Sequence, residues 1–376
     1  MKVAIIHEWF TAHAGSEKVT EQLLLLYPEA DLYAVVDFLP EKERGFLRGK
    51  AVHTSFIQRL PFAKKHFRHY LALMPLAIEQ FDLSQYDLVI SSSHAVAKGV
   101  VGHPFQTHIC YCHSPIRYAW ALQADYLRGA KATKGLKSFF IRCVLHYLRG
   151  WDFRTAQQVD AFIANSSFIK TRIAKYYRRD AVVINPPVDL ENFTLETEKE
   201  DYYLAASRLV PYKNIPLIAR AFRAMPDKKL VIIGDGSDLP VVKKIVASAP
   251  NITFLAYQPD GVLRHKMARA KAFVFAALED FGIMPVEAQA SGTPVIAYGK
   301  GGALDSIQGL DSPTPTGIFF KEQTEASIIE AVMLFEKEQA RFTAAACRAN
   351  AERFSEERFR EQIKAFVEQA IDLNQQ

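Results

Sequence analysis

The sequence predicts an α/β protein in two halves, each a parallel sheet with helices on both sides. Short apolar runs, typical of buried parallel strands, alternate with amphipathic helical stretches along the chain. This rhythm stops near residue 185 and restarts near residue 202. A length of 376 residues also exceeds what one ordinary core needs and suits two domains.

The composition is that of a globular protein, with 49% hydrophobic and 23% charged residues, which argues against disorder and fibres. No run approaches the ~20 apolar residues of a membrane span. The first predicted strand directly follows the initiator Met, so we expect no signal peptide and a cytoplasmic location. Cys110 and Cys112 are expected to share one strand face and, with the distant Cys143 and Cys347, to be buried reduced thiols.

In the first half, six apolar runs are predicted as strands, at residues 3–6, 32–36, 88–91, 108–112, 161–164 and 182–184. Helices such as Glu17 to Leu26 fall between them. Gly15 and Ser16 follow the first strand, and Ser16 is expected to cap the first helix, leaving backbone N–H groups for a phosphate or for ordinary capping. The G-x-G-x-x-G fingerprint is absent there, which argues against a dehydrogenase.

A break in the pattern separates the halves and predicts domains at residues 1–190 and 191–354. Paired prolines in Asn185-Pro-Pro-Val-Asp189 and a charged stretch to Glu200 interrupt the apolar rhythm. Strands of the second half are predicted at residues 202–206, 230–233, 252–255, 272–277 and 295–297. The remaining segment, 355–376, carries a helical stripe at Phe359, Ile363, Phe366, Val367 and Ile371.

The most informative stretch is Glu279-Asp-Phe-Gly-Ile-Met-Pro-Val-Glu287-Ala-Gln-Ala-Ser-Gly-Thr-Pro294, between two predicted strands. Pro285 suits the first turn of a helix and Gly292 its C-terminal cap. Ligands of parallel sheets bind outside the carboxyl ends of the strands, where a helix N-terminus attracts anions. Two carboxylates there suit a ligand rich in hydroxyls, although each Glu alone also fits a solvated loop or a helix-dipole partner.

Three other loops follow predicted strands and carry polar residues. His113 lies in Tyr111-Cys-His-Ser-Pro-Ile-Arg-Tyr-Ala-Trp120, just before the strand-breaking proline. Arg208 and Lys213 follow the first strand of the second half, where a guanidinium fork and an ammonium can clamp a diphosphate. Gly234-Asp-Gly236 follows the next strand and is by itself an ordinary turn.

The E-x7-E pair, with Phe-Gly and Pro between and Ser-Gly-Thr-Pro after, resembles the signature of retaining GT-B glycosyltransferases of family 4. The resemblance implies two Rossmann-like domains facing across a cleft, with acceptor bound by residues 1–190 and nucleotide sugar by residues 191–354. The helix of residues 355–376 is implied to cross back to the N-terminal domain. Glu279 is implied to contact sugar hydroxyls, Glu287 the ribose, Arg208 and Lys213 the diphosphate, and His113 the reacting centre.

The same resemblance implies further donor contacts at Gly15, Gly234, Gly236, Tyr257, Gln258, Phe281, Gly282, Ile283 and Met284. The His-Ser-Pro-x-Arg-Tyr-x-Trp string resembles bacterial O-antigen and exopolysaccharide mannosyltransferases, which implies a GDP-mannose donor. No Asp-x-Asp occurs, consistent with a reaction that needs no metal or other cofactor. UDP-sugar donors, a sugar-nucleotide epimerase and a non-catalytic donor-binding partner remain alternatives.

Two basic stretches in the first half predict a membrane surface as partner. Residues 59–70 hold four Lys or Arg and no acid, and residues 128–154 hold seven against one Asp, both mixed with aromatics. Such stretches suit anionic lipid, and predict a peripheral protein at the inner membrane face with a lipid-linked glycan acceptor. The alternative is a solvated basic face over an ordinary core. Nucleic acid is not expected as a partner.

Overall fold

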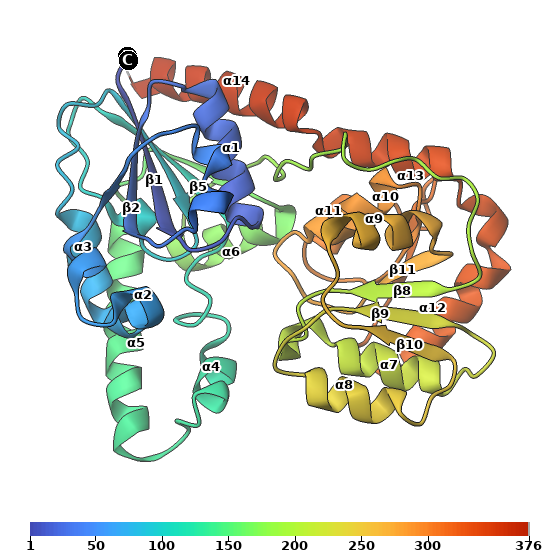
Figure 1. Cartoon of the computed structure of the whole chain (residues 1–376). Helices are drawn as coiled ribbons and strands as arrows, with labels where there is room; N and C mark the ends of the chain where they lie inside the picture. Colours follow the sequence, from blue (N-terminus) through green and yellow to red (C-terminus); the bar gives the residue numbers. More distant parts are fainter. Residues whose placement is uncertain (375–376) are drawn as a thin grey trace. The chain divides into compact units, whose positions relative to one another are not determined.

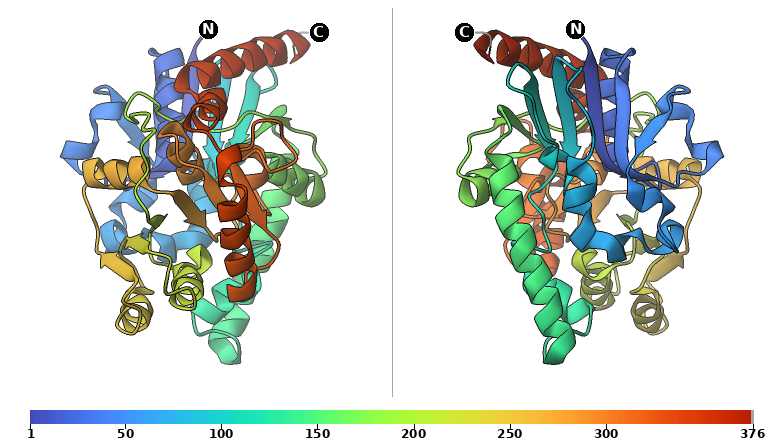
Figure 2. Two further views of the ribbon diagram at one scale, coloured as in Figure 1. Left: turned by 90° about the vertical axis from the view of Figure 1, so that its right-hand side faces the viewer. Right: turned by 90° about the vertical axis from the view of Figure 1, so that its left-hand side faces the viewer.

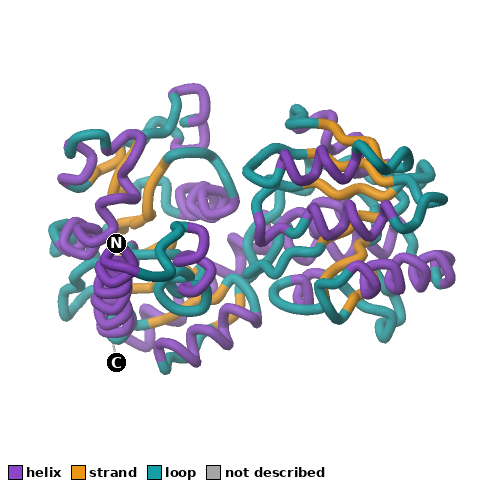
Figure 3. Tube along the Cα trace, turned by 90° about the horizontal axis from the view of Figure 1, so that it is seen from below, coloured by secondary structure: helices purple, strands orange, loops and turns teal. Residues whose placement is uncertain are grey.

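The structure, a computed structural model, describes residues 1–374. The chain divides into two compact units, one of Met1–Pro187 with the C-terminal segment from Glu357, and one of Val188–Glu356. The sequence predicts the two corresponding domain boundaries after residues 190 and 354. Strands alternate with helices in both units (Figure 3).

The first unit is built on a seven-stranded parallel sheet in the order β3-β2-β1-β4-β5-β6-β7. Its strands are β1 (Val3–Phe10), β2 (Asp31–Asp37), β3 (Val52–Thr54), β4 (Leu88–Ser93), β5 (Thr107–Cys112), β6 (Ala161–Ala164) and β7 (Val182–Val183). The sequence predicts all of them except β3. This strand has three partly exposed residues at the sheet edge, too few to show an apolar run.

Helices cover both faces of this sheet (Figure 1). They are α1 (Gly15–Leu26), α2 (Ala63–His66), α3 (Met74–Glu79), α4 (Gln123–Gly129), α5 (Gly135–Ala156), α6 (Ser167–Tyr177) and α14 (Glu356–Asn374). Side chains alternate across β1: Val3 and Ile5 pack in the core that contains α1 and α14, whereas Ala4 and Ile6 pack in the core that contains α3. Among the helices of residues 1–374, none combines the length and hydropathy that a bilayer-spanning segment needs.

The cysteines of β5 obey the same alternation. Cys110 and Cys112 are buried in one core with α6, as predicted from their spacing. All four cysteines are free thiols, but Cys143 is exposed on α5 and not buried as expected. Within residues 1–374, no group of three or more His, Cys, Asp or Glu side chains is arranged to hold a metal ion.

Helix α14 belongs to the first unit although the second unit precedes it in the chain. Its predicted stripe points inward, with Phe359, Ile363 and Val367 fully buried beside β1 and α1. The ring of Phe359 lies 5.8 Å from that of Tyr111, and Arg360 donates a hydrogen bond to Gln22.

The second unit has a six-stranded parallel sheet in the order β10-β9-β8-β11-β12-β13. Its strands are β8 (Tyr203–Ala206), β9 (Leu230–Ile233), β10 (Ile252–Leu255), β11 (Ala272–Phe275), β12 (Val295–Tyr298) and β13 (Gly317–Phe320). Its helices are α7 (Ile215–Arg223), α8 (Leu239–Val246), α9 (Asp260–Arg269), α10 (Ile283–Ala290), α11 (Ala303–Ser306), α12 (Glu325–Lys337) and α13 (Ala344–Ala351). The sequence predicts every strand except β13, which lies at the edge and begins with Gly317.

Two cores fill the second unit, one on each face of the sheet. Leu230 and Ile232 of β9 pack in the core with α7, α8 and α12, and Val231 and Ile233 pack in the core with α9, α10 and α13. Because every strand is parallel, all six carboxyl ends lie along one edge of the sheet. The loops of this unit that carry predicted donor residues therefore share that edge.

Candidate functional site

The predicted clamp lies at the point where the strand order of the second sheet changes direction. From β8, the next strands along the chain, β9 and β10, lie on one side, and β11, β12 and β13 lie on the other. Such a switch point leaves a crevice between the loops that follow the two central strands. Here these are the loop of residues 207–214 after β8 and the loop of residues 276–282 after β11.

Lys213 and Glu279 meet across this switch point. Their side chains form an ion pair and are only 13% and 17% exposed. The Lys213 ammonium also lies 5.3 Å from the ring centroid of Tyr212 and 6.0 Å from that of Phe275, within the range of a cation–π contact. The structure thus brings together two of the residues that the sequence singles out.

Arg208 lies on the same turn as Lys213. Its guanidinium is exposed and donates a 3.2 Å hydrogen bond to the hydroxyl of Tyr212. Tyr212 is therefore shared by both cations, which positions them side by side on one loop. Together with Glu279, the two cations leave one positive charge in excess, which suits an anionic ligand.

Gly234 and Gly236 let the loop after β9 lie directly against the loop after β8. A Cβ at Gly234 would be 1.9 Å from the Ser207 carbonyl oxygen, and one at Gly236 would be 2.4 Å from that of Leu209. The Leu209 N–H donates to the Asp235 carbonyl at 2.8 Å, which closes the contact. These glycines therefore support the backbone of the Arg208 turn, whatever else they contact.

Helix α10 has the ends that the sequence predicts. Pro285 lies in its first turn, and Gly292 follows its end with a φ of +77°, a conformation that favours glycine. Glu287 is half-buried in the second turn. Helix α10 begins directly after the loop that carries Glu279, so its N-terminus lies at the same edge of the sheet as the Lys213–Glu279 pair.

The loop before α10 is held by backbone and core contacts. Gly282 has a φ of +88°, and a Cβ there would lie 3.7 Å from a carboxylate oxygen of Glu279. Phe281 is buried, with its ring 5.5 Å from that of Phe354, so only its backbone is available to a ligand. Gly302, which the sequence analysis missed, donates its N–H to the Glu279 carbonyl at 2.9 Å.

The remaining predicted donor residues of this unit are spread along the edge. Ile283 and Met284 are half-buried at the start of α10. Tyr257, which is 72% exposed, and Gln258 lie on the loop after β10. Strand β9 separates that loop from β8, so these two residues lie on the far side of the Gly234 loop from the clamp.

In the first unit, His113 follows β5 at the carboxyl edge of its sheet. The backbone N–H of His113 donates to the Ser93 carbonyl at 2.8 Å, and its ring Nε2 lies 2.9 Å from the hydroxyl of Ser92. Burial, reinforced by the neighbouring His94 and His7, holds the pKa of His113 well below its usual value. The imidazole is therefore neutral at neutral pH.

Ser92 connects His113 to a second histidine that the sequence analysis did not select. The Ser92 hydroxyl lies 3.2 Å from Nδ1 of His7, and Nε2 of His7 lies 3.4 Å from a carboxylate oxygen of Glu17. Burial raises the pKa of Glu17, but the hydrogen bond from His7 and its charge lower it more, to about 2. Glu17 is therefore ionised at neutral pH.

The expected serine cap of α1 is wrong. The helix begins at Gly15 with Ala14 as the N-cap residue, so Ser16 lies inside the first turn. Glu17 performs the capping because its carboxylate reaches back to accept the N–H of Ala14 at 3.2 Å and the hydroxyl of Ser16 at 2.9 Å. Gly15 thus lies beside a carboxylate.

Glu8, on β1 beside His7, is fully buried and organises the turn after β4. Its carboxylate accepts five hydrogen bonds of 2.7–3.0 Å, from the Ser93 hydroxyl and the backbone N–H groups of residues 94–97. Burial raises its pKa, but His94 and these backbone donors lower it below the ordinary value. His7 and Glu8 directly follow the apolar run of residues 3–6, and polar residues directly after an apolar run are the kind of signal that identified His113.

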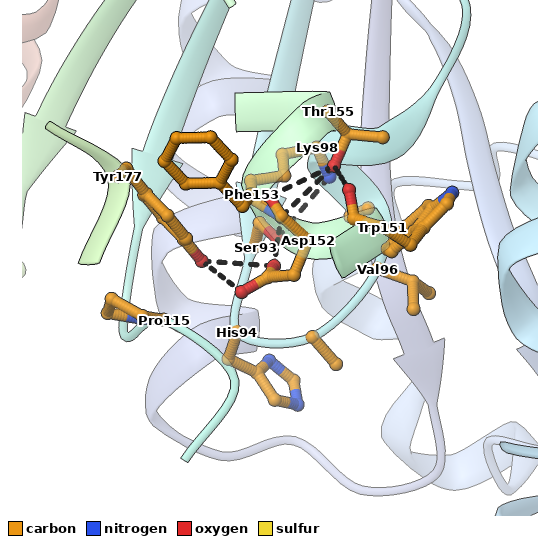
Figure 4. Close-up of polar contacts among 12 residues, drawn as sticks. Ser93, His94, Val96, Lys98, Pro115, Trp151, Asp152, Phe153, Thr155 and Tyr177 are labelled. Carbon is orange, nitrogen blue, oxygen red and sulfur yellow. Dashed lines mark hydrogen bonds and ion pairs between the residues drawn. The ribbon is translucent and has the colours of Figure 1, made fainter. Parts of the chain in front are cut away.

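A buried ion pair supports the loop that carries His113 (Figure 4). Lys98, which follows β4, and Asp152, which lies on α5, form an ion pair, and their side chains are 1% and 0% exposed. The Asp152 carboxylate also accepts hydrogen bonds from the hydroxyl of Tyr177, at 2.9 and 3.0 Å, and from Nε1 of Trp120, at 2.7 Å. Trp120 ends the His113 loop, so Asp152 ties that loop to α5 and α6.

Two family models match the chain, one on each side of the predicted boundary. A model described as Glycosyltransferase Family 4 matches residues 15–192, and a model described as Glycosyl transferases group 1 matches residues 189–354. The two matches follow each other along the chain in the order of the two units.

Known proteins with similar sequences include two mannosyltransferases. The O-antigen chain mannosyltransferase RfbU of Salmonella typhimurium is 32% identical over 137 residues, which cover 34% of this chain and 39% of RfbU. The Alpha-1,3/1,6-mannosyltransferase ALG2 of Saccharomyces cerevisiae is 23% identical over 354 residues, which cover 80% of this chain and 64% of ALG2. Each match thus spans less than two thirds of the relative's own length.

A solved structure shares the fold. HepE of Anabaena, in complex with UDP, superposes with a TM-score of 0.69 at 16% identity. The superposition covers 98% of this chain and 100% of HepE.

Proposed function

This chain belongs to the GT-B glycosyltransferases of family 4, and from that membership we propose that it is a retaining hexosyltransferase that uses GDP-mannose as donor. The observation that carries the proposal is the Lys213–Glu279 pair beside Arg208 at the switch point of the second sheet. At this point a carboxylate that can bind hydroxyl groups lies beside cations that can bind phosphates. The likeness to RfbU and ALG2, both mannosyltransferases by name, supports mannose.

In this proposal the second unit binds the donor. Arg208, Lys213 and the first N–H groups of α10 neutralise the diphosphate, and Glu279 accepts hydrogen bonds from hydroxyls of the sugar. Glu287 accepts hydrogen bonds from the ribose. These groups supply the charge stabilisation of the leaving diphosphate, so we propose a reaction that does not depend on a metal.

The first unit is proposed to bind the acceptor and to bring His113 to the reacting centre. The acceptor oxygen attacks the anomeric carbon on the face from which the diphosphate departs. As the carbon–oxygen bond to the diphosphate breaks, a leaving phosphate oxygen takes the proton of the acceptor hydroxyl. The configuration of the sugar is thereby retained, and the products are the glycosylated acceptor and GDP.

UDP-sugars are the alternative donors, since HepE was solved with UDP. Titration calorimetry with GDP-mannose, UDP-glucose and UDP-GlcNAc is expected to show at least about tenfold tighter binding of GDP-mannose, or ~1.4 kcal/mol.

Glu287→Ala should raise the donor KM more than Glu279→Ala does, whereas Glu279→Ala should change the preference among sugars. Turnover with acceptor should be insensitive to EDTA.

Each alternative predicts its own result in the binding titration or in a turnover assay with and without acceptor. Tighter binding of a UDP-sugar would replace the proposed donor. An epimerase would form isomeric products without acceptor, and a binding partner would bind the donor without turnover. Identical donor preferences in the Glu279 and Glu287 variants would overturn the division of roles between these two residues.

We also propose that the enzyme acts at the inner face of the membrane on a lipid-linked glycan acceptor. Helix α5 extends well past the strands of its own sheet (Figure 2). The N-terminal half of α5 exposes apolar side chains on one side, and their exposed fractions are 79% for Leu136, 61% for Phe139 and 65% for Phe140. Exposed Lys134 and Lys137 lie beside them.

The charge on this helix is more one-sided than the sequence indicates. The only acid within residues 128–154 is Asp152, which is buried and paired with Lys98. All exposed charges of that stretch are therefore positive. Residues 59–70 contribute less apolar surface than expected, because Phe67 belongs to the core and Phe62 is the exposed aromatic of that stretch.

Flotation with phosphatidylglycerol vesicles is expected to recover the protein at low salt, and phosphatidylcholine vesicles should not. Each surface cation contributes about 1 kcal/mol toward anionic lipid, so binding should fall as salt rises. Phe139→Ser with Phe140→Ser should weaken binding. Phe105→Ser is the matched control, because Phe105 is 92% exposed on a loop without Lys or Arg neighbours. If neither kind of vesicle recovers the protein at low salt, the membrane proposal is refuted.

A further inference from the structure

Lys213 serves two anionic partners, one in the protein and one in the ligand. Its ammonium pairs with the Glu279 carboxylate, and both side chains are largely shielded from water. The proposed function assigns the same ammonium to the diphosphate of the donor. A diphosphate that reaches Lys213 therefore comes close to the Glu279 carboxylate as well.

Hydrogen bonds hold the backbone on both sides of this ion pair. The side-chain amide of Asn214, the residue after Lys213, donates to the carbonyl of Ala276 at 3.4 Å, and Ala276 begins the loop that carries Glu279. The Glu279 carbonyl accepts the backbone N–H of Gly302 at 2.9 Å. A rotation of the Glu279 side chain can turn its carboxylate from Lys213 toward a ligand, but the negative charge stays in the site.

A sugar nucleotide and a nucleoside diphosphate place different groups beside this charge. An ionised carboxylate can only accept hydrogen bonds, so it needs donors. The hexose of a sugar nucleotide supplies hydroxyl donors, and each phosphate of its diphosphate carries a single negative charge. The terminal phosphate of a nucleoside diphosphate loses a second proton with a pKa of about 6. At higher pH it is a dianion without a donor.

We propose that Glu279 is a specificity-determining residue that makes the site bind the intact sugar nucleotide in preference to the nucleoside diphosphate left after transfer. With the sugar present, its hydroxyls compensate Glu279 for the share of Lys213 that the diphosphate takes. Without the sugar, the carboxylate faces the terminal phosphate, and adjacent like charges weaken binding. Release of the spent nucleotide is thereby favoured.

This inference rests on the proposed function only in that the site takes a sugar nucleotide, and it holds for either base. Titration calorimetry at about pH 8 with GDP and GDP-mannose, and in parallel with UDP and UDP-glucose, measures the preference. EDTA in the buffer keeps divalent cations from neutralising the diphosphate. Glu279→Gln is expected to bind the nucleoside diphosphate about tenfold more tightly than the wild type, because the amide removes the charge and can donate to the phosphate. The affinity for the sugar nucleotide should change less, since the amide oxygen still accepts a hydroxyl.

Glu279→Asp keeps the charge and should keep the preference of the wild type. Asp201→Asn is the matched control for the loss of one carboxylate, because Asp201 is 73% exposed beside Lys229 at the opposite edge of the sheet. It should leave all affinities unchanged. An unchanged ratio of the two affinities in Glu279→Gln, or an equal shift of that ratio in Glu279→Asp, would overturn the inference and leave the proposed function intact. If the wild type binds none of the four nucleotides, the proposed function fails and this inference fails with it.

Discussion

Replacing Asp152 with alanine is expected to lower the free energy of unfolding by about 3–5 kcal/mol, because it leaves a buried charge without its partner. Lys98 is 1% exposed, so water cannot replace the lost carboxylate. The hydroxyl of Tyr177 and Nε1 of Trp120 lose their acceptor as well. The chain has three tryptophans, all in the first unit, so guanidinium unfolding followed by tryptophan fluorescence measures the affected unit.

Two variants test this explanation of the loss. Lys98→Met with Asp152→Leu should recover part of the stability, because it removes the unpaired charge but leaves the hydroxyl of Tyr177 and Nε1 of Trp120 without their acceptor. Asp125→Ala should have little effect, because the Asp125–Arg128 pair is exposed. An Asp152→Ala protein as stable as the wild type would show that the pair does not support the first unit.

Arg208→Ala and Lys213→Ala are each expected to lower kcat/KM for the nucleotide sugar by about 10²–10³, the effect of removing one preorganised group that stabilises transition-state charge. In the Lys213 variant, Glu279 also loses the cation that orients it. Steady-state kinetics with the preferred donor measures both losses.

Lys229→Ala serves as the control for loss of a lysine in the second unit. Lys229 precedes β9 and therefore lies at the opposite edge of the sheet from the clamp, where it pairs with Asp201. Its turnover should equal that of the wild type. Wild-type turnover in Arg208→Ala or Lys213→Ala would remove that residue from the donor site.

The sequence alone predicts nearly all of both sheets because buried parallel strands appear as continuous apolar runs. Strands β6, β9 and β10 have the predicted bounds. The exceptions, β3 and β13, are edge strands, although the edge strands β7 and β10 are predicted. Strand β3 has only three residues, all at least partly exposed, and β13 begins with Gly317, which interrupts the apolar run.

Much of the site also follows from the sequence, because a residue that follows a parallel strand must lie at the carboxyl edge of its sheet. This rule places Arg208, Lys213 and Glu279 on one edge and His113 on another. It cannot show that Lys213 pairs with Glu279, since that contact depends on β8 and β11 being neighbours. Strand order is a property of the folded sheet.

Local hydrophobic patterns and turn residues encode the two-unit α/β organisation, the strands and the loops that carry the clamp, so these features can be predicted from the amino-acid sequence. Which polar residues are buried, and what they bind, depends on tertiary contacts. Glu17 caps α1 in place of the predicted Ser16. Asp152 is buried and paired with Lys98, so it does not contribute to the exposed, basic surface of α5. Whether a carboxylate is solvated, capping or paired depends on neighbours distant in the chain, which local sequence does not specify.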